Sequence, residues 1–188
     1  MAGLYLASQS PRRTELLTQV GIDHIVVSST YEESNEGYDS PIEMVKAQAM
    51  GKARSAVGVP EGSIVLGADT IVVLDNEVLG KPQDEADARQ MLERLSGRCH
   101  SVITGVVLLI KGKEVVFHNE TKVYFKELAP FEIESYIASG EPMDKAGAYG
   151  IQGKGALWVE KIEGSYTNVV GLPVEHVYDE LCKALGAK

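Results

Sequence analysis

The sequence of 188 residues contains only two cysteines and no long apolar run. Cys99 and Cys182 form no CxxC pair and have no histidine at metal-ligand spacing, so we expect two buried, reduced thiols without a chemical role. The longest apolar runs, such as residues 103–110, are far shorter than the ~20 residues that a membrane-spanning helix needs. The first residues lack the basic segment of a secretory leader, and we therefore expect a cytoplasmic protein.

Positive charge is also scarce, with 18 Lys and Arg against 27 Asp and Glu and a net charge of −9. A chain without a basic field is not expected to bind a nucleic-acid backbone. With 44% hydrophobic and 24% charged residues it otherwise has the composition of a globular protein. Its length fits one domain, or a single core with two lobes, because domains usually have ~100 to 200 residues. A local cluster of cations on such an acidic chain suits a small anionic ligand.

Strand and helix patterns alternate along the chain. Apolar and β-branched runs predict strands near residues 3–7, 24–29, 63–68, 71–74, 102–110, 115–125 and 158–162. Apolar spacing predicts helices at 11–20, 41–57, 88–95, 130–137 and 173–185. The two long strands flank Gly112 and should form a hairpin, whereas residues 141–155 belong to no regular element. This order predicts an α/β fold with a mixed sheet in one compact unit.

The segment from Ser8 to Arg13 combines a helix start with two cations. Ser10 is a favoured N-cap and Pro11 a favoured first helical residue, so a helix should begin at Pro11. The first turn of a helix exposes backbone N–H groups and the positive end of its dipole, where Arg12 and Arg13 are unfavourable without an anion. Serine hydroxyls, backbone donors and guanidinium groups together suit a phosphate-bearing ligand. The alternative is a solvated basic turn.

Asp69 interrupts an apolar strand pattern, between residues 64–66 and 71–74. Buried strand positions are normally apolar, and exceptions are expected at functional sites. A metal ion or a nearby cation would keep this carboxylate ionised, so that it binds the metal or accepts a proton from water. The alternative is an aspartate at a strand end that caps the following turn.

Three further charged residues, in two segments, suggest a phosphate or metal site. Glu32 and Glu33 lie in a polar loop over residues 30–39 that should be exposed, and carboxylates of this kind bind Mg²⁺. Lys81, between Gly80 and Pro82, would place a cation near the strand end after Asp69. The alternatives are a solvated charge run and an ordinary turn, because no GxxxxGK[ST] pattern is present.

The loop over residues 141–153 is dense in glycine, which permits close backbone approach to a ligand. Gln152 carries both a donor and an acceptor, as recognition of the O4 and N3–H edge of uracil or thymine requires. The alternative is an amide exposed on a surface loop. The four histidines lie far apart and receive no role.

Five segments, in order along nearly the whole chain, resemble the Maf family of nucleoside triphosphate pyrophosphatases. They are Ser8-x-Ser10-Pro11-Arg12-Arg13-x-Glu15-Leu16-Leu17, Gly67-Ala68-Asp69-Thr70, Gly80-Lys81-Pro82, Leu95-Ser96-Gly97 and the run from Asp144 to Gly153. The resemblance implies a two-lobed α/β fold like that of inosine triphosphate pyrophosphatases, with the active site in the cleft between lobes. It also implies attack of water on the α-phosphorus, which gives a nucleoside monophosphate and pyrophosphate.

The resemblance assigns roles to individual residues. Asp69 would accept the proton, Glu33 would bind metal or position water, and Lys81, Arg12 and Arg13 would hold the phosphates. The pattern at Thr70 and Gln152 is similar to the branch that acts on dTTP and UTP rather than on methylated GTP, with Arg12 as a third specificity position. The expected catalytic residues are thus Asp69, Glu33 and Lys81, the expected metal ligands are Glu33 and Asp69, and the expected substrate-binding residues are Ser8, Ser10, Arg12, Arg13, Lys52, Thr70, Asp144, Lys145 and Gln152.

The same resemblance implies a divalent cation, Mg²⁺ or Mn²⁺, as cofactor and a pyrimidine nucleoside triphosphate as ligand. It also implies a homodimer, and no nucleic acid or membrane partner is expected. Two alternatives remain at this point. One is a nucleotide-binding regulator of cell division with little catalysis, and the other is a pyrophosphatase directed at purine triphosphates.

Overall fold

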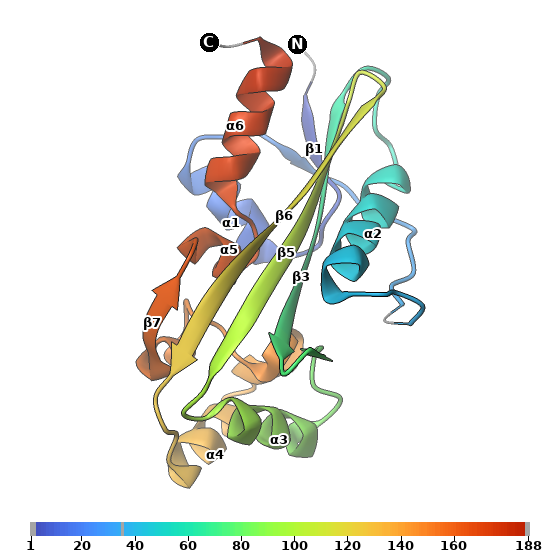
Figure 1. The fold of residues 1–188 in the computed structure, drawn as a ribbon. Coiled ribbons are helices and arrows are strands. Elements are labelled where there is room, and N and C mark those ends of the chain that lie inside the picture. The colour runs from blue at the N-terminus through green and yellow to red at the C-terminus, as the bar shows by residue number, and fades with distance from the viewer. Residues whose placement is uncertain (1–2, 35, 187–188) are drawn as a thin grey trace. The chain divides into compact units, whose positions relative to one another are not determined.

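The computed structural model describes residues 3–34 and 36–186, and its centre is a mixed seven-stranded sheet (Figure 1). The strands are β1 (Leu4–Leu6), β2 (Ile25–Val26), β3 (Ile64–Leu74), β4 (Glu77–Leu79), β5 (Cys99–Ile110), β6 (Lys113–Phe125) and β7 (Val159–Glu163). Their order is β2-β1-β3-β5-β6-β7, with β4 paired to β3. β1 runs parallel to β2 and β3, whereas β4 and β7 run antiparallel to β3 and β6. The predicted mixed sheet is confirmed.

Helices accompany the sheet at the predicted places. They are α1 (Pro11–Gln19), α2 (Pro41–Arg54), α3 (Glu85–Leu95), α4 (Pro130–Ala138), α5 (Tyr166–Val170) and α6 (Val174–Leu185). The five-residue α5 was not predicted, because it is too short to show a helical period. The segment predicted to be irregular contains three short 3-10 turns, η1 (Glu141–Asp144), η2 (Ala146–Ala148) and η3 (Lys154–Trp158). No helix in the described part of the chain is long and apolar enough to cross a membrane.

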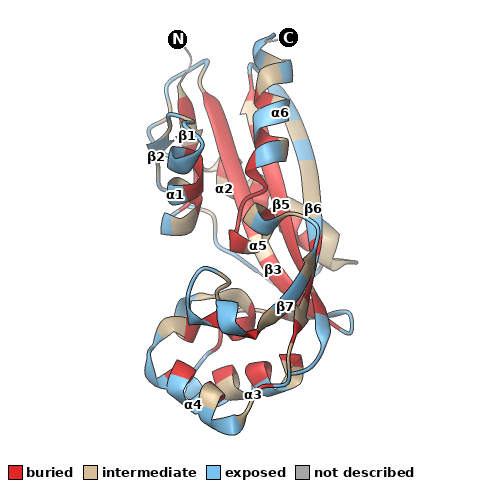
Figure 2. Cartoon of the chain, turned by 90° about the vertical axis from the view of Figure 1, so that its left-hand side faces the viewer, coloured by how far each residue is buried: buried red, intermediate tan, exposed pale blue. Residues whose placement is uncertain are grey.

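The chain divides into two compact units. Unit 1 comprises the described residues of Met1–Thr70, Thr104–Asn119 and Gly171–Lys188, and unit 2 comprises Ile71–Ile103 and Glu120–Val170. The division falls within β3, β5 and β6, so each unit contains a part of all three strands. Figure 2 shows β3 and β5 buried over most of their length.

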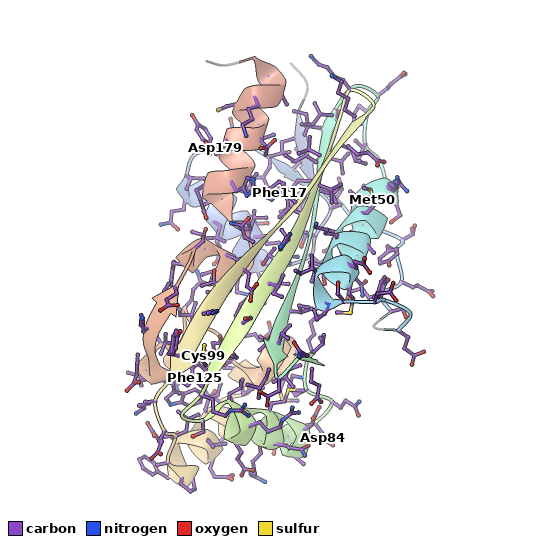
Figure 3. All side chains as sticks on the ribbon, viewed as in Figure 1. Met50, Asp84, Cys99, Phe117, Phe125 and Asp179 are labelled. Atoms are coloured by element: carbon purple, nitrogen blue, oxygen red, sulfur yellow. The ribbon has the colours of Figure 1, made fainter. Side chains whose placement is uncertain are left out.

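In unit 1, α2 covers one face of the strands and α6 lies on the other side (Figures 1 and 2). α2 packs almost on the backbone of the sheet at two glycines. A Cβ atom at Gly67 would lie 2.3 Å from the carbonyl oxygen of Ala49, and one at Gly105 would lie 2.5 Å from the backbone carbonyl of Val45. On the α6 side, Phe117 of β6 stacks on His176 with 3.9 Å between ring centroids (Figure 3). The two glycines therefore fix how closely α2 approaches β3 and β5.

Unit 2 has its own core, in which aromatic rings surround a buried histidine. His100 is 3% exposed, and its Nε2 lies 2.7 Å from the hydroxyl of Tyr149. Its ring also packs edge-on against Phe125. Burial lowers the pKa of His100 to about 4, so the ring is neutral at pH 7. His100, which received no role from the sequence, belongs to this core.

The two strands predicted at residues 63–68 and 71–74 are a single strand, β3, which continues through Asp69 and Thr70. The alternative that Asp69 caps a turn at a strand end is therefore wrong. The turn that follows β3 lies at Asp75 and Asn76, whose φ values of 52° and 64° are left-handed. This two-residue turn joins β3 to β4 and suits the right-handed twist of a hairpin.

Three other expectations need correction. Cys99 is exposed and Cys182 is half-buried, so they are free thiols but not buried ones. Cys99 is the first residue of β5, where a side chain still faces solvent (Figure 3). Apolar spacing also predicts Tyr178 and Leu185 on the buried face of the last helix, α6, but both are 57% exposed. α2 ends at Arg54 rather than near residue 57, since Ala56 forms an isolated bridge with Ser29.

Candidate active site

Asp69 lies in the middle of β3, 8% exposed, and pairs with a lysine from α2. The Nζ atom of Lys52 is 2.7 Å from Oδ1 of Asp69, and the Lys52 side chain is itself only 13% exposed. A carboxylate at this depth stays ionised only beside a cation or a metal. The sequence-based prediction that Asp69 needs such a partner is confirmed, and Lys52 is that partner.

Glu33 contacts the same lysine from the loop between β2 and α2. Its Oε1 is also 2.7 Å from Nζ of Lys52, while its side chain is 55% exposed. The two carboxylate oxygens that share this ammonium therefore lie within twice 2.7 Å of each other. The acidic loop, predicted to be exposed, thus brings one of its glutamates to Asp69, and Glu32 remains exposed.

Two residues that sequence analysis missed hold this loop against α2. Gln48 is 1% exposed, and its Nε2 donates to the carbonyl oxygen of Ser34 over 2.7 Å. The ring of Tyr31 lies on Gly51, where a Cβ atom would meet it at 2.2 Å. The available signal for Gln48 was its position one helical turn before Lys52, on the face that also carries Val45.

Tyr31 adds a neutral hydroxyl to the surroundings of the two carboxylates. A hydrogen bond with Tyr38, burial and the negative charges of Asp69 and Glu33 raise the pKa of Tyr31 to about 12. The two hydroxyl oxygens are 3.5 Å apart. Tyr31 therefore keeps its proton at pH 7 and cannot act as a base there.

Arg13 is the centre of a second, buried network in unit 1. Its Nε donates to the carbonyl oxygen of Gly171 over 2.8 Å, Nη1 donates to Ser8 Oγ over 3.0 Å, and Nη2 donates to Thr70 Oγ1 over 3.0 Å. Thr70 Oγ1 also lies 2.9 Å from Thr104 Oγ1. Arg13 is 7% exposed, and burial lowers its pKa, against the opposing effect of Asp69. The guanidinium thus ties α1 to β3 and to the segment before α6.

The start of α1 differs from the prediction in one detail. Ser10 occupies the N-cap position, but its side chain makes no capping hydrogen bond. The hydroxyl of Ser8 accepts the backbone N–H of Ser10 over 3.2 Å instead, in addition to the bond from Arg13. The first turn of α1 contains no acidic residue, and Arg12 there is half-buried. The predicted combination of a helix start with two arginines is present, with one guanidinium turned inward.

The other expected site residues belong to unit 2. Lys81 is exposed just after β4, and Gln152 is exposed in the turn between η2 and η3. Lys145 donates from Nζ to Asp144 Oδ1 and to the carbonyl oxygen of Glu141, each over 2.7 Å. Their expected roles in binding stay predictions.

The donor set at Asp69 and Glu33 fits one hard divalent cation. Mg²⁺ prefers oxygen ligands and is usually held by one or two carboxylates, with phosphate oxygens and water completing its shell. Asp69 and Glu33 offer two such carboxylates close together. Within residues 3–34 and 36–186, no group of three or more His, Cys, Asp or Glu side chains has the geometry of a metal site. A cation here would thus take most of its ligands from phosphate and water.

Known proteins resemble this chain in sequence and in fold. A protein named dTTP/UTP pyrophosphatase from Bacillus cytotoxicus is 51% identical over 181 residues, which are 96% of this chain and 95% of that protein. One of the same name from Symbiobacterium thermophilum is 53% identical over 96% of this chain and 93% of its own length. The solved structure of the Staphylococcus aureus Ham1 protein matches with a TM-score of 0.54 at 13% identity, covering 95% of this chain and 97% of that one.

The Ham1 match shows that the two proteins share a fold. The α/β fold expected from the sequence is therefore confirmed. The family described as Maf-like protein matches residues 3–184. With that match and relatives of about half identity over nearly the whole length, the chain belongs to the Maf family.

Proposed function

We propose that this protein hydrolyses dTTP and UTP to the nucleoside monophosphate and pyrophosphate. The observation that carries hydrolysis is the ion pair of the buried Asp69 with Lys52, with the second carboxylate of Glu33 on the same ammonium. The choice of substrate is supported by the relatives named dTTP/UTP pyrophosphatase, which are about half identical to this chain.

In this mechanism a water molecule attacks the α-phosphorus and Asp69 accepts the proton that it loses, while pyrophosphate leaves. Asp69 and Glu33 would hold Mg²⁺ or Mn²⁺, which when bound supplies positive charge for the phosphates and makes water a better nucleophile. The backbone N–H groups at the start of α1 and the side chain of Arg12 bind phosphate oxygens. Arg13 keeps Ser8 and Thr70 in place through the bonds described above.

The residues of unit 2 complete the proposal. Lys81 and Lys145 add positive charge for the phosphates, and Asp144 positions Lys145 through their ion pair. Gln152 distinguishes the base, because its amide can donate to O4 and accept from N3–H of uracil or thymine. Thr70 and Arg12 are the other proposed specificity positions.

The test is pyrophosphate release from dTTP, UTP, CTP, GTP, ITP and 7-methyl-GTP, each with Mg²⁺ or Mn²⁺. We expect release mainly from dTTP and UTP, and Asp69→Asn should lower kcat by about 10² to 10⁴, the usual contribution of a general base. The variant should still fold, since Lys52 keeps Glu33 as a partner. Near-normal turnover by Asp69→Asn would remove Asp69 from the mechanism, and tight binding without release would indicate a regulator instead.

The same set of nucleotides tests the proposed base recognition. Gln152→Ala should reduce the preference for UTP over GTP, and Gln90→Ala, which removes another exposed amide of unit 2, should leave that preference unchanged. An unchanged ratio in Gln152→Ala would show that base selection lies elsewhere.

A further inference from the structure

Lys52 occupies the position at which a metal ion would meet the two carboxylates. Its Nζ is 2.7 Å from Oδ1 of Asp69 and 2.7 Å from Oε1 of Glu33. An ammonium group and a divalent cation both bind carboxylate oxygens by direct contact, at about 2.1 Å in the case of Mg²⁺. Repulsion between the two cations opposes binding of both to these two carboxylates at contact distance.

Lys52 is the member of this trio that an anionic ligand attracts. Asp69 is fixed by its place in the middle of β3, and the loop that carries Glu33 is tethered one residue later by the bond from Gln48 to Ser34. A lysine side chain is a flexible stem of four carbons that ends in an ammonium group, and this group binds phosphate readily. Movement of its ammonium takes the positive charge of Lys52 away from both carboxylates.

We propose that Lys52 acts as a competing cation, which keeps divalent metal off the Asp69–Glu33 pair until the triphosphate draws its ammonium away. Lys52 then neutralises phosphate oxygens while the metal takes its place on the carboxylates. This inference rests on the proposed function for the identity of the anion that moves Lys52. It makes nucleotide binding a condition for metal binding, so the empty protein binds metal weakly.

The first measurement is Mn²⁺ binding to the nucleotide-free protein, followed by the electron paramagnetic resonance signal of free Mn²⁺. Lys52→Met should bind Mn²⁺ at least about tenfold more tightly than the unmodified protein, because a unit positive charge at contact distance opposes a second cation by more than that factor. Lys52→Arg, which keeps the charge, should bind Mn²⁺ as weakly as the unmodified protein.

A matched control removes a different cation from the same helix. Arg54→Met takes away the positive charge two residues further on, where Arg54 pairs with the half-exposed Glu114. Because solvent and salt screen the charge of an exposed pair, the Mn²⁺ affinity of Arg54→Met should stay within about twofold of that of the unmodified protein. If Lys52→Met does not fold, Lys52→Gln gives the same test, because its amide can still donate to Asp69 without a charge.

The second measurement is binding of dUTP in the presence of EDTA. The same Lys52→Met change should weaken this metal-free binding about tenfold or more, because one phosphate-binding cation is lost. Tighter binding of Mn²⁺ together with weaker binding of dUTP distinguishes competition from a structural role, since a damaged site would bind both ligands less well. Equal or weaker Mn²⁺ binding by Lys52→Met would overturn the inference.

These outcomes are separable from those for the proposed function. Hydrolysis of dTTP and UTP together with unchanged Mn²⁺ affinity in Lys52→Met rejects the inference and leaves the function intact. Tighter Mn²⁺ binding in Lys52→Met without any hydrolysis keeps the competition between cations and rejects the function.

Discussion

Arg12 and Arg13 are neighbours in the sequence but have different surroundings. Arg13 is buried, with three of its nitrogens donating to Gly171, Ser8 and Thr70, whereas Arg12 is half-buried at the start of α1. A buried guanidinium is stable only while its acceptors stay in place, and those acceptors are in turn left without a donor if it is removed. Arg13 therefore contributes to the folded state as well as to the charge of the site.

We expect Arg13→Met to lower the free energy of unfolding by about 3 kcal/mol, because it breaks a buried, charged hydrogen-bond network. Arg13→Lys should also be destabilising, since an ammonium lacks the planar fork that reaches all three acceptors. Arg12→Met should cost less stability, about 1 kcal/mol or less, because Arg12 is only half-buried, while it raises KM for UTP. Urea unfolding and steady-state kinetics measure these effects, and an equal loss of stability in Arg12→Met would contradict the assignment.

At this scale the sequence identified charges but not their partners. Asp69 could be singled out because a carboxylate in an apolar strand pattern requires a cation. Arg12 and Arg13 could not be distinguished, since burial of one of them depends on where α1 lies relative to β3. The bond from Gln48 to the acidic loop was likewise missed, because the path of that loop is not encoded in any short pattern.

At the scale of elements, the contact of α2 with the sheet positions Lys52 beside the two carboxylates proposed to act in catalysis. α2 carries Lys52 and Gln48, and it approaches β3 and β5 closely only because residues 67 and 105 have no side chain. A displacement of α2 by a few tenths of an ångström changes the distance from Lys52 to Asp69 directly. Glycine in these strands is thus required for packing, and the backbone needs no left-handed conformation there.

Gly105→Ala tests this contact. The added methyl group would lie 2.5 Å from the backbone of Val45, so α2 must shift, and we expect a loss of about 2 kcal/mol in unfolding free energy. Turnover should fall as well, because Lys52 moves with the helix. Gly112→Ala is the control, because an added Cβ atom there would have no atom within 4 Å apart from its chain neighbours. Its φ of 77° should lower the unfolding free energy by about 1 kcal/mol without an effect on turnover. Full activity of Gly105→Ala would show that the site tolerates movement of α2.

Local signals predicted most elements, and tertiary contacts explain the exceptions. The start of α2 has such a local signal, because Ser40 is a favoured N-cap before Pro41 and its hydroxyl accepts the N–H of Glu43 over 3.2 Å. β3 was predicted as two strands because Asp69 and Thr70 are polar. Lys52 and Arg13, which are distant in sequence, satisfy those two side chains and allow the strand to continue.

At the scale of the whole molecule, the division into two units passes through three strands rather than through a linker. Each of β3, β5 and β6 continues without interruption from one unit into the other, and the three are neighbours in the sheet. Local unfolding usually follows units that can lose their hydrogen bonds independently. We propose that the chain is a single domain, because neither unit contains the whole of β3, β5 or β6.

This proposal predicts one cooperative unfolding transition. The only tryptophan, Trp158, is 3% exposed in unit 2 and reports on that unit alone through its fluorescence. Gly105→Ala changes unit 1, so in a single domain it should lower the urea midpoint of Trp158 fluorescence as much as that of far-ultraviolet circular dichroism. A fluorescence midpoint that stays at its original value while the dichroism midpoint falls would mean that the units unfold separately. In that case β3, β5 and β6 would have to melt in halves, and Asp69 and Thr70, which are the last residues of unit 1 along β3, would lie where the strand breaks.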